Sequence, residues 1–147
     1  MTKVRRLLAL FLVLALGAGI AACGSDSDSG DSDPNGIEGV TWQVMNLATQ
    51  GAATSLPQGI KPPTLEISDG RAQVFAGCNS GSGDAEVGDT TITFGAIAMT
   101  KKSCGQIQNQ VEFLVNQVLQ GKTTYSVNAD GNLIIEKGND SLVYTKG

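Results

Sequence analysis

The sequence predicts a mainly β domain with one α-helix near its C-terminal end. Two observations lead to this prediction: apolar residues come in short runs between turn signals, and one later stretch has helical spacing. The chain contains eight or nine such runs. Sets of short strands like these close into a barrel or pack as a sandwich, because open sheet edges tend to pair with other chains.

The first predicted strand covers Val40 to Leu47, where apolar and polar residues alternate. This alternation places Val40, Trp42 and Val44 on one face of the strand. The following stretch, Gln50 to Pro63, is rich in Gly, Ala and Pro, and we expect it to be a loop.

A hairpin is predicted next. The Asp69-Gly70 pair is a strong two-residue turn signal, and it joins a strand over Thr64 to Ser68 to a return strand over Arg71 to Gly77. Further short strands are predicted over Gly81 to Val87, Thr90 to Phe94, Ala96 to Thr100, Lys122 to Val127, Asn132 to Glu136 and Ser141 to Thr145.

The predicted helix covers Gln106 to Leu119. Its apolar residues follow the i, i+4, i+7 spacing that gives a helix one apolar face, and Gly121 follows where a C-cap is expected. The apolar face consists of Ile107, Val111, Leu114, Val115 and Val118. We expect this face to pack on the sheet.

The N-terminal 22 residues have the order of a secretory signal peptide. A basic stretch ending at Arg6 is followed by an uncharged apolar run and then by small residues before Cys23. The run from Leu7 to Ala22 is shorter than the roughly 20 residues that a transmembrane helix needs. The segment resembles the lipobox of bacterial lipoproteins, in which the cysteine thiol receives diacylglyceryl and the chain is cut just before it.

We therefore predict a signal peptide over residues 1–22 and a lipid on Cys23. Several acyl chains on one cysteine would anchor the protein stably to a membrane. The predicted location is the outer face of the bacterial cell membrane, or the periplasmic side where an outer membrane exists. The membrane is thus the first expected partner.

Residues 23–36 are predicted to be the lipid-carrying cysteine and a flexible linker. The linker is rich in Asp and Ser and has no apolar side chain for a core, so its charges repel and extend it. A calcium loop of the EF-hand type is excluded, because Gly30 stands at the third ligand position and Asp31 where glycine is needed. The remaining residues, 37–147, are predicted to form one domain.

The charge of the mature chain is strongly negative. Loss of the signal peptide removes three of the ten Lys and Arg residues and none of the 14 Asp and Glu, which leaves a formal charge of −7. Such a chain, without a basic cluster, is a poor ligand for nucleic acid or anionic lipid headgroups.

The sequence predicts no catalytic, cofactor-binding or metal-binding residues. It contains no histidine, which removes Ser-His-Asp and Cys-His pairs and imidazole metal ligands. The Gly121-Lys122-Thr123 triplet lacks the earlier glycine of a phosphate loop and follows a helix. Asp84, Glu86 and Asp89 form the one candidate acid/base cluster, and an exposed loop is the favoured interpretation of it.

The two remaining cysteines, Cys78 and Cys104, are an even pair in an oxidising compartment. The alternatives are a disulfide and two free thiols. We favour the disulfide, because an unpaired exported thiol is reactive, and closing this loop would stabilise the fold by about 3.5 kcal/mol.

Four blocks of the chain resemble the META domain, the family that includes the HslJ lipoproteins. The blocks are Gly39 to Gln43, Pro63 to Gly70 running into Phe75 to Asn79, Phe94 to Cys104, and Glu112 to Leu114 followed by Tyr125 to Val127 and Leu133 to Ile135. Two positions depart from the family pattern: Gly81 stands where an aromatic residue is frequent, and Ala96 where proline is frequent.

The resemblance implies a small antiparallel β-barrel with lipocalin-like topology and one α-helix. It implies no established catalytic residue, and it links the chain to envelope stress and secretion. We expect Asn79, in the best-matched block, to hydrogen-bond to backbone at a turn.

The leading functional hypothesis is a non-enzymatic, membrane-tethered binding or envelope-maintenance module. Its ligand would be a small apolar molecule in the barrel mouth or an unknown envelope protein. The alternative is a structural, protein-interaction or inhibitor-like domain, and an enzyme using surface carboxylates is less favoured. An open interior among Trp42, Phe75, Phe94 and Tyr125 would favour the small ligand, and a filled interior with an exposed apolar patch would favour a protein partner.

Overall fold

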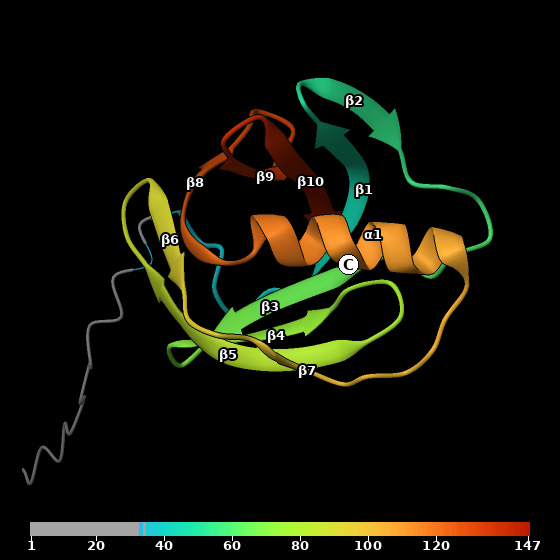
Figure 1. Ribbon diagram of the computed structural model, residues 1–147. Coiled ribbons are helices and arrows are strands. Elements are labelled where there is room, and N and C mark those ends of the chain that lie inside the picture. Colours follow the sequence, from blue (N-terminus) through green and yellow to red (C-terminus); the bar gives the residue numbers. More distant parts are fainter. Residues whose placement is uncertain (1–32, 34) are drawn as a thin grey trace, which may run out of the picture. The chain divides into compact units, whose positions relative to one another are not determined.

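The computed structural model describes Asp33 and residues 35–147, and in this range the chain forms ten strands and one helix (Figure 1). The longer strands are β1 (Trp42–Thr49), β3 (Thr64–Ser68), β4 (Arg71–Phe75), β5 (Ser80–Val87), β6 (Thr91–Phe94), β8 (Gly121–Val127), β9 (Leu133–Lys137) and β10 (Asp140–Lys146). Two short strands are β2 (Ala52–Ser55) and β7 (Ala98–Met99), and the helix is α1 (Gln106–Val118).

The eight longer strands close into an antiparallel barrel. The order around the wall is β1-β3-β4-β5-β6-β8-β9-β10, and pairing of β10 with β1 closes the ring. Trp42 illustrates the closure, since it lies opposite Leu65 of β3 on one side and Lys146 of β10 on the other. The antiparallel β-barrel with one helix that the sequence and the family resemblance predict is confirmed.

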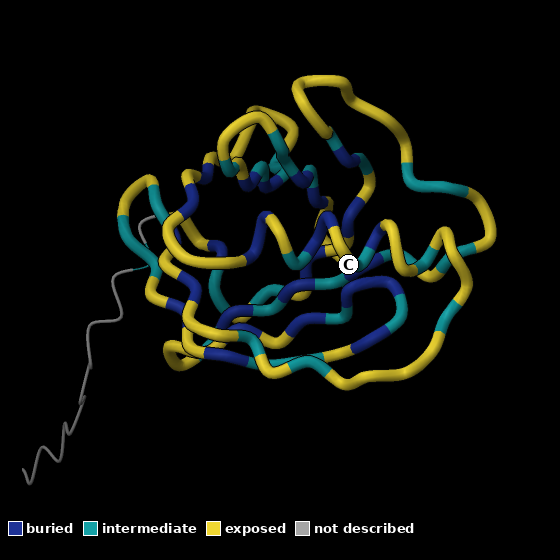
Figure 2. Tube along the Cα trace, in the orientation of Figure 1, coloured by how far each residue is buried: buried dark blue, intermediate teal, exposed yellow. Residues whose placement is uncertain are grey.

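The core lies inside this ring. Buried residues alternate with more exposed ones along the wall strands, as the period of two along a strand requires (Figure 2). In β1 a bulge between Val44 and Asn46 interrupts this alternation. The largest fully buried side chains include Trp42, Tyr144 and the aliphatic residues Leu65, Ile67, Ile92, Leu133, Ile135 and Leu142.

The strand directions define two ends of the barrel. The turns after β3, β5 and β8 lie at one end, where the chain also enters the wall at β1, and we call it the N-terminal end. The hairpin after β1, the turns after β4 and β9, and α1 lie at the other, which we call the helix end. In Figure 1, α1 runs across the ring of strands.

Apolar side chains close both ends. At the N-terminal end Ile37 is fully buried, and its carbonyl accepts a hydrogen bond of 2.9 Å from Nε1 of Trp42. At the helix end the buried face of α1 contributes Val111, Val115 and Val118 to the same core. The barrel interior is therefore filled by the protein's own side chains.

Most of the local predictions are confirmed. The helix covers Gln106–Val118, with Leu119 as its C-cap, and four of its five predicted face residues are buried. Asp69 and Gly70 both have positive φ, 51° and 70°, as a hairpin turn of the mirror-image type requires. Trp42 and Val44 are buried on one face of β1, whereas Val40 precedes the strand and is partly buried.

The predicted loop over Gln50 to Pro63 is wrong in part, because it contains β2. Gln50 and Gly51 form a tight turn with φ of 52° and 79°, and β2 folds back on the end of β1. All four β2 residues are exposed. Since they bury no side chains, they carry no apolar alternation from which a strand could be predicted.

Two further predictions need correction. Ile107, predicted on the buried face of the helix, is 49% exposed, because it lies in the first turn of α1 at the rim of the barrel. The strand predicted over Ala96 to Thr100 shrinks to the two residues of β7, which pair only with Gly81 and Ser82.

The signal peptide over residues 1–22, the lipid on Cys23 and most of the linker lie outside the described residues. The end of the predicted linker is described: Asp33 accepts a hydrogen bond of 2.8 Å from the Glu38 N–H, and Nδ2 of Asn35 donates to the Asp89 carbonyl at 2.8 Å. In the part of the chain that the structure describes, no helix has the length and apolarity to span a membrane.

Candidate functional site

A surface groove of about 330 Å³ lies at the helix end, between α1 and the hairpin formed by β1 and β2. Leu47, Thr49, Thr54 and Pro57 line it from the hairpin side and the following loop, and Ile107, Gln110, Val111, Phe113, Leu114 and Gln117 line it from α1. No charged residue is among them. We call this surface the α1–β2 groove.

Two of its apolar side chains are largely exposed to solvent. Phe113 is 69% exposed and Ile107 49%, whereas the neighbouring Leu114 is buried in the core. The exposure of Phe113 follows from helix geometry, because this residue lies off the buried stripe formed by Val111, Leu114, Val115 and Val118. An exposed phenylalanine beside an apolar groove is typical of a protein interaction site.

The half-buried Glu112 holds the helix to the turn after β4. The Glu112 carboxylate accepts hydrogen bonds from Nδ2 of Asn79, at 3.1 and 3.0 Å, and from the Asn79 backbone N–H at 3.0 Å. Oδ1 of Asn79 in turn accepts bonds from the Lys102 N–H at 2.7 Å and from the Thr100 hydroxyl at 2.8 Å. Asn79 is 4% exposed, so these bonds replace its contacts with water.

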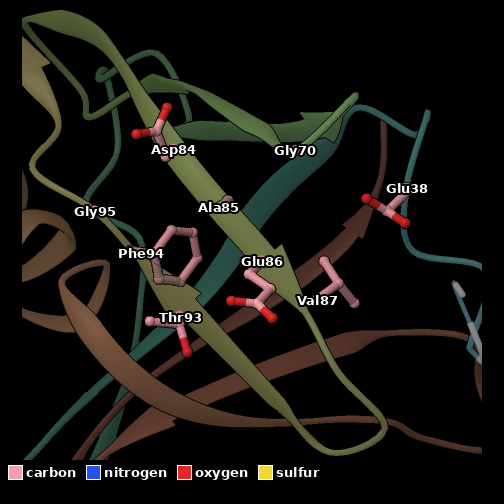
Figure 3. Close-up of a pocket in the computed structure, with 9 residues that line it drawn as sticks. All are labelled: Glu38, Gly70, Asp84, Ala85, Glu86, Val87, Thr93, Phe94 and Gly95. Carbon is pink, nitrogen blue, oxygen red and sulfur yellow. The ribbon is translucent and has the colours of Figure 1, made fainter. Parts of the chain in front are cut away.

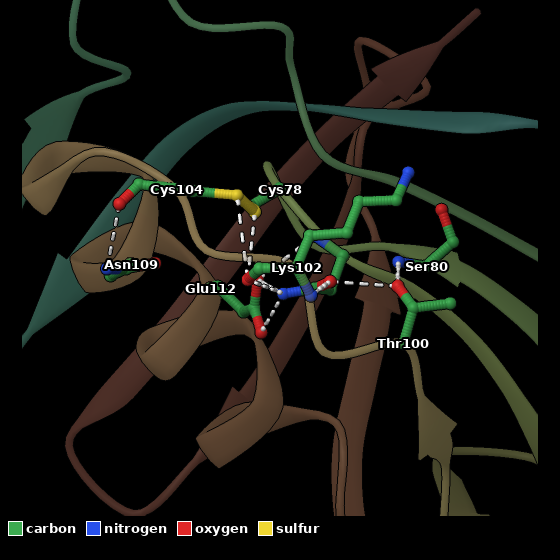
Figure 4. The surroundings of a disulfide bond; sticks show 8 residues. Cys78, Ser80, Thr100, Lys102, Cys104, Asn109 and Glu112 are labelled. Atoms are coloured by element: carbon green, nitrogen blue, oxygen red, sulfur yellow. Dashed lines mark hydrogen bonds between the residues drawn. A yellow bond between two sulfur atoms is a disulfide. The ribbon is translucent and has the colours of Figure 1, made fainter.

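The predicted disulfide between Cys78 and Cys104 is present directly beside this network (Figure 4). The two Cα atoms are 6.2 Å apart, within the range of natural disulfides. The bond ties the turn after β4 to the segment that leads into α1. Asn79 also hydrogen-bonds to backbone at this turn, as predicted, since its carbonyl accepts from the Ala76 N–H at 2.8 Å.

Asp84 and Glu86, two of the three candidate acid/base residues, line a second surface pocket of about 580 Å³ on the outer face of the barrel. Asp84 is exposed and pairs with Arg71 at 3.1 Å. Figure 3 shows the side chains of Asp84, Glu86 and Glu38 pointing in different directions around this pocket. Asp89 lies in the turn after β5 and is not among the lining residues.

The four aromatic residues proposed to surround an open interior lie in two different environments. Trp42, Phe94 and Tyr125 are buried in the packed core. Phe75 is only partly buried, and the Lys61 ammonium lies 4.9 Å from the centre of its ring. These residues therefore do not frame a common cavity in the barrel.

Both tyrosines have raised pKa values. Burial is the main cause for Tyr125, with a smaller contribution from nearby Asp33, Asp89 and Glu38, and the hydrogen bond from Asn35 partly opposes it. The Tyr125 hydroxyl donates to the Gly88 carbonyl at 2.8 Å. Complete burial raises the pKa of Tyr144, whose hydroxyl has no hydrogen-bond partner among the described residues.

Within Asp33 and residues 35–147, no three His, Cys, Asp or Glu side chains are grouped so that they could hold a metal ion. Two of the described carboxylates have separate partners instead: Asp84 pairs with Arg71, and Glu112 accepts hydrogen bonds from Asn79.

The sequence alone does not predict the α1–β2 groove. From the sequence, Phe113 is noted only as part of a block that resembles the family. Ile107 is predicted to lie on the buried face of the helix, and the residues of β2 are predicted to lie in a loop. The one available signal is the absence of charge along α1, where Glu112 is the single charged residue and bonds to Asn79.

The closed eight-stranded wall, the helix across one end and the disulfide beside Asn79 define a small disulfide-linked β-barrel domain. The META domain family model matches residues 35–146, and the chain belongs to this family.

Solved structures support the fold. The chain is similar to a protein from Burkholderia xenovorans whose structure was determined by NMR, with a TM-score of 0.62 and 24% identity over 76% of this chain and 83% of that one. A second NMR structure has a TM-score of 0.59 and 17% identity over 76% of this chain and 92% of that one. No curated protein matches the chain.

Proposed function

We propose that this META domain protein is an exported, lipid-anchored and non-enzymatic binding module of the bacterial envelope, whose partner is a protein held at the helix end of the barrel. The observation that carries the proposal is the filled barrel with an exposed apolar groove at that end. Filling by Ile37 and α1 leaves the interior no mouth for a ligand, whereas Phe113 and Ile107 present apolar surface to solvent.

The position of the groove suits a tethered protein. The chain meets the barrel at its N-terminal end, where Asn35 bonds to the Asp89 carbonyl and to the Tyr125 hydroxyl. The α1–β2 groove lies at the other end. A domain anchored through Cys23 would therefore carry the groove on the side away from its point of attachment.

The linker sets the distance at which the partner would be found. Nine residues, Gly24 to Ser32, separate Cys23 from Asp33. As the flexible linker predicted from its composition, this segment would have a typical end-to-end distance of about 17 Å, and repulsion among its aspartates would extend it further. The partner would thus be a membrane protein or a protein close to the membrane.

Two measurements test the proposal. In the first, the protein and its Cys23→Ala variant are compared by membrane fractionation and mass spectrometry; the variant should leave the membrane fraction and lack the acyl mass. An unchanged distribution and mature mass would contradict the lipid anchor.

In the second, a photo-crosslinking amino acid replaces Phe113 in living cells. We expect a discrete adduct with an envelope protein from position 113 and none from Val127, an apolar residue 37% exposed near the N-terminal end. Equal crosslinking from both positions, or none from either, would contradict a partner at the helix end.

An enzyme using Asp84, Glu86 and Asp89 is the less favoured third hypothesis, and the pocket lined by the first two is the observation in its favour. Replacing all three with alanine should leave the fold and the Phe113 adduct unchanged. Loss of an assigned activity with the adduct retained would favour the enzyme.

A further inference from the structure

We propose that β2 is a docking edge: an extended, uncharged segment of a partner protein adds to it as a further strand and places apolar side chains in the α1–β2 groove. The inference rests on the proposed function and specifies the chemistry of the partner. Three features of the helix end support it: an unpaired edge, a groove beside that edge, and the absence of charge on both.

The edge is the first feature. β2 pairs with β1 from Asn46 to Thr49, and within the described residues no other strand pairs with its second side. Because the turn has two residues, Thr49 and Ala52 are the hydrogen-bonded pair that closes the hairpin. The N–H and C=O groups of successive residues in a strand point to opposite edges, so those of Ala53 and Ser55 point away from β1. The Ser55 carbonyl accepts one long bond, 3.4 Å, from the Thr54 hydroxyl.

These outward groups define the kind of ligand. A row of unpaired N–H and C=O groups on a strand edge is completed by the backbone of another strand, and peptide-binding domains use this mode of recognition. β2 also lacks the lysine or proline that natural proteins place on an edge to prevent such pairing.

The groove is the second feature. Thr54 of β2 lines it, so a strand added to β2 would direct every second side chain to the same face, toward α1. There, Ile107 and Phe113 offer exposed apolar surface. Backbone pairing would supply the alignment, and these two side chains would select apolar residues at alternate positions.

Charge is the third feature. The lining residues of the groove and all of β2 are uncharged in a mature chain of formal charge −7. The net charge would repel an acidic segment, and a basic segment, although attracted to the domain as a whole, would find no carboxylate to pair with in the groove. A second copy of this chain would add another −7 to the complex, so a neutral segment of another protein is favoured.

A synthetic peptide tests this inference on the exported full-length protein in lipid nanodiscs. The probe is a blocked, fluorescently labelled peptide of sequence Ser-Val-Thr-Val-Thr-Leu-Ser. Two counterparts serve as controls: one with proline at its adjacent third and fourth positions, which cannot pair, and one with glutamate in place of both threonines. Binding is measured by fluorescence anisotropy, and hydrogen exchange of residues 52–55 by mass spectrometry.

We expect the alternating peptide to bind and to slow exchange of residues 52–55, and the proline counterpart to bind at least tenfold more weakly. The glutamate counterpart should also lose affinity, most strongly at low salt. Ala53→Pro, which removes an outward N–H, should weaken binding at least tenfold, and Phe113→Ala should weaken it about tenfold. Val127→Ala, at the other end, should change it less than twofold.

Several outcomes would overturn the inference. They are the absence of binding, equal binding of the proline counterpart, and wild-type binding by a folded Phe113→Ala variant. Protection of residues 52–55 that depends on protein concentration without peptide, together with dimer formation, would assign the edge to a second copy. A Phe113 adduct in cells without peptide binding would support the proposed function and reject β2 as a docking edge. Peptide binding without the adduct would support the docking edge and reject the proposed partner at the helix end.

Discussion

Asn79 and Glu112 join the turn after β4 to the middle of α1. Nδ2 of Asn79 lies 3.1 and 3.0 Å from the two carboxylate oxygens of Glu112, and the Asn79 N–H donates to the same carboxylate at 3.0 Å. The helix that forms one wall of the α1–β2 groove is therefore fixed to the barrel by a charged acceptor as well as by its apolar face.

Asn79→Ala should destabilise the domain by about 2–4 kcal/mol, because it leaves the Glu112 carboxylate and the Lys102 N–H without their buried partner. The free energy of unfolding in urea measures this loss. Gln117→Ala, an exposed position on the same helix, is the control and should change stability by less than about 0.5 kcal/mol. Equal effects of the two substitutions would contradict a special role for Asn79.

Removal of the disulfide should weaken the fold without abolishing it. The double variant Cys78→Ser with Cys104→Ser loses the loop constraint, worth about 3.5 kcal/mol on the chain-entropy model. Asn79 still joins the same two segments through Lys102 and Glu112. We expect a lower urea midpoint with an unchanged circular dichroism spectrum. A double variant that is unfolded in buffer would contradict the prediction that the fold survives without the disulfide. An unchanged urea midpoint would contradict the prediction that the disulfide stabilises it.

Gly83 of β5 should not tolerate a side chain. A Cβ there would lie 2.7 Å from the Ala96 carbonyl oxygen and 3.0 Å from Cα of Ile97, both in the segment that crosses β5. Gly83→Ala should thus cost about 1–3 kcal/mol by overpacking. Gly88→Ala is the matched control, because its Cβ would meet only ordinary contacts of 3.5 Å or more. Thermal unfolding of both variants distinguishes them.

The two tyrosines should respond in opposite ways to loss of the hydroxyl. Tyr125→Phe removes hydrogen bonds with Gly88 and Asn35 and should cost about 1–2 kcal/mol at pH 7. Tyr144→Phe removes a buried hydroxyl that lacks a partner among the described residues, so stability should be unchanged or higher. Urea unfolding of both variants at pH 7 gives the comparison, and destabilisation by Tyr144→Phe would reveal a partner for its hydroxyl.

Alkaline pH should destabilise the wild type through the same residues. Burial raises the pKa of Tyr125 in the folded state above the ordinary tyrosine value of 10.0, so its protonated form is favoured by folding. This stabilisation is complete below pH 10 and is lost as the pH rises through the folded pKa. Tyr125→Phe should therefore flatten the decline of unfolding free energy between pH 9 and 12. An unchanged slope would contradict the raised pKa.

The family departure at Gly81 has a structural explanation, whereas nothing in the structure explains the departure at Ala96. A Cβ at position 81 would overlap the Met99 sulfur and would lie 2.6 Å from the Ala98 carbonyl oxygen. Ala98 and Met99 of β7 thus occupy the space next to β5 that a side chain at position 81 would need. The sequence identifies the departure at Gly81 but not its reason, which depends on the pairing of β7 with β5.

The sequence by itself determined the elements whose signals are local. The spacing of Val111, Leu114, Val115 and Val118 predicts α1 because a helix buries one face, and Asp69-Gly70 predicts its hairpin because both residues adopt positive φ. The pair of Cys78 and Cys104 could also be predicted, since the predicted signal peptide implies export and the assignment of Cys23 to the predicted lipid leaves no other pairing.

Tertiary structure alone decided the features that form the candidate site. β2 exists because the turn at Gln50 and Gly51 returns the chain along β1, and its exposed side chains leave no apolar pattern. Ile107 fits the helical stripe yet is exposed, because the barrel rim ends before the first turn of α1. Local patterns report which face of an element is apolar, and only the packing of distant segments determines how much of that face is covered.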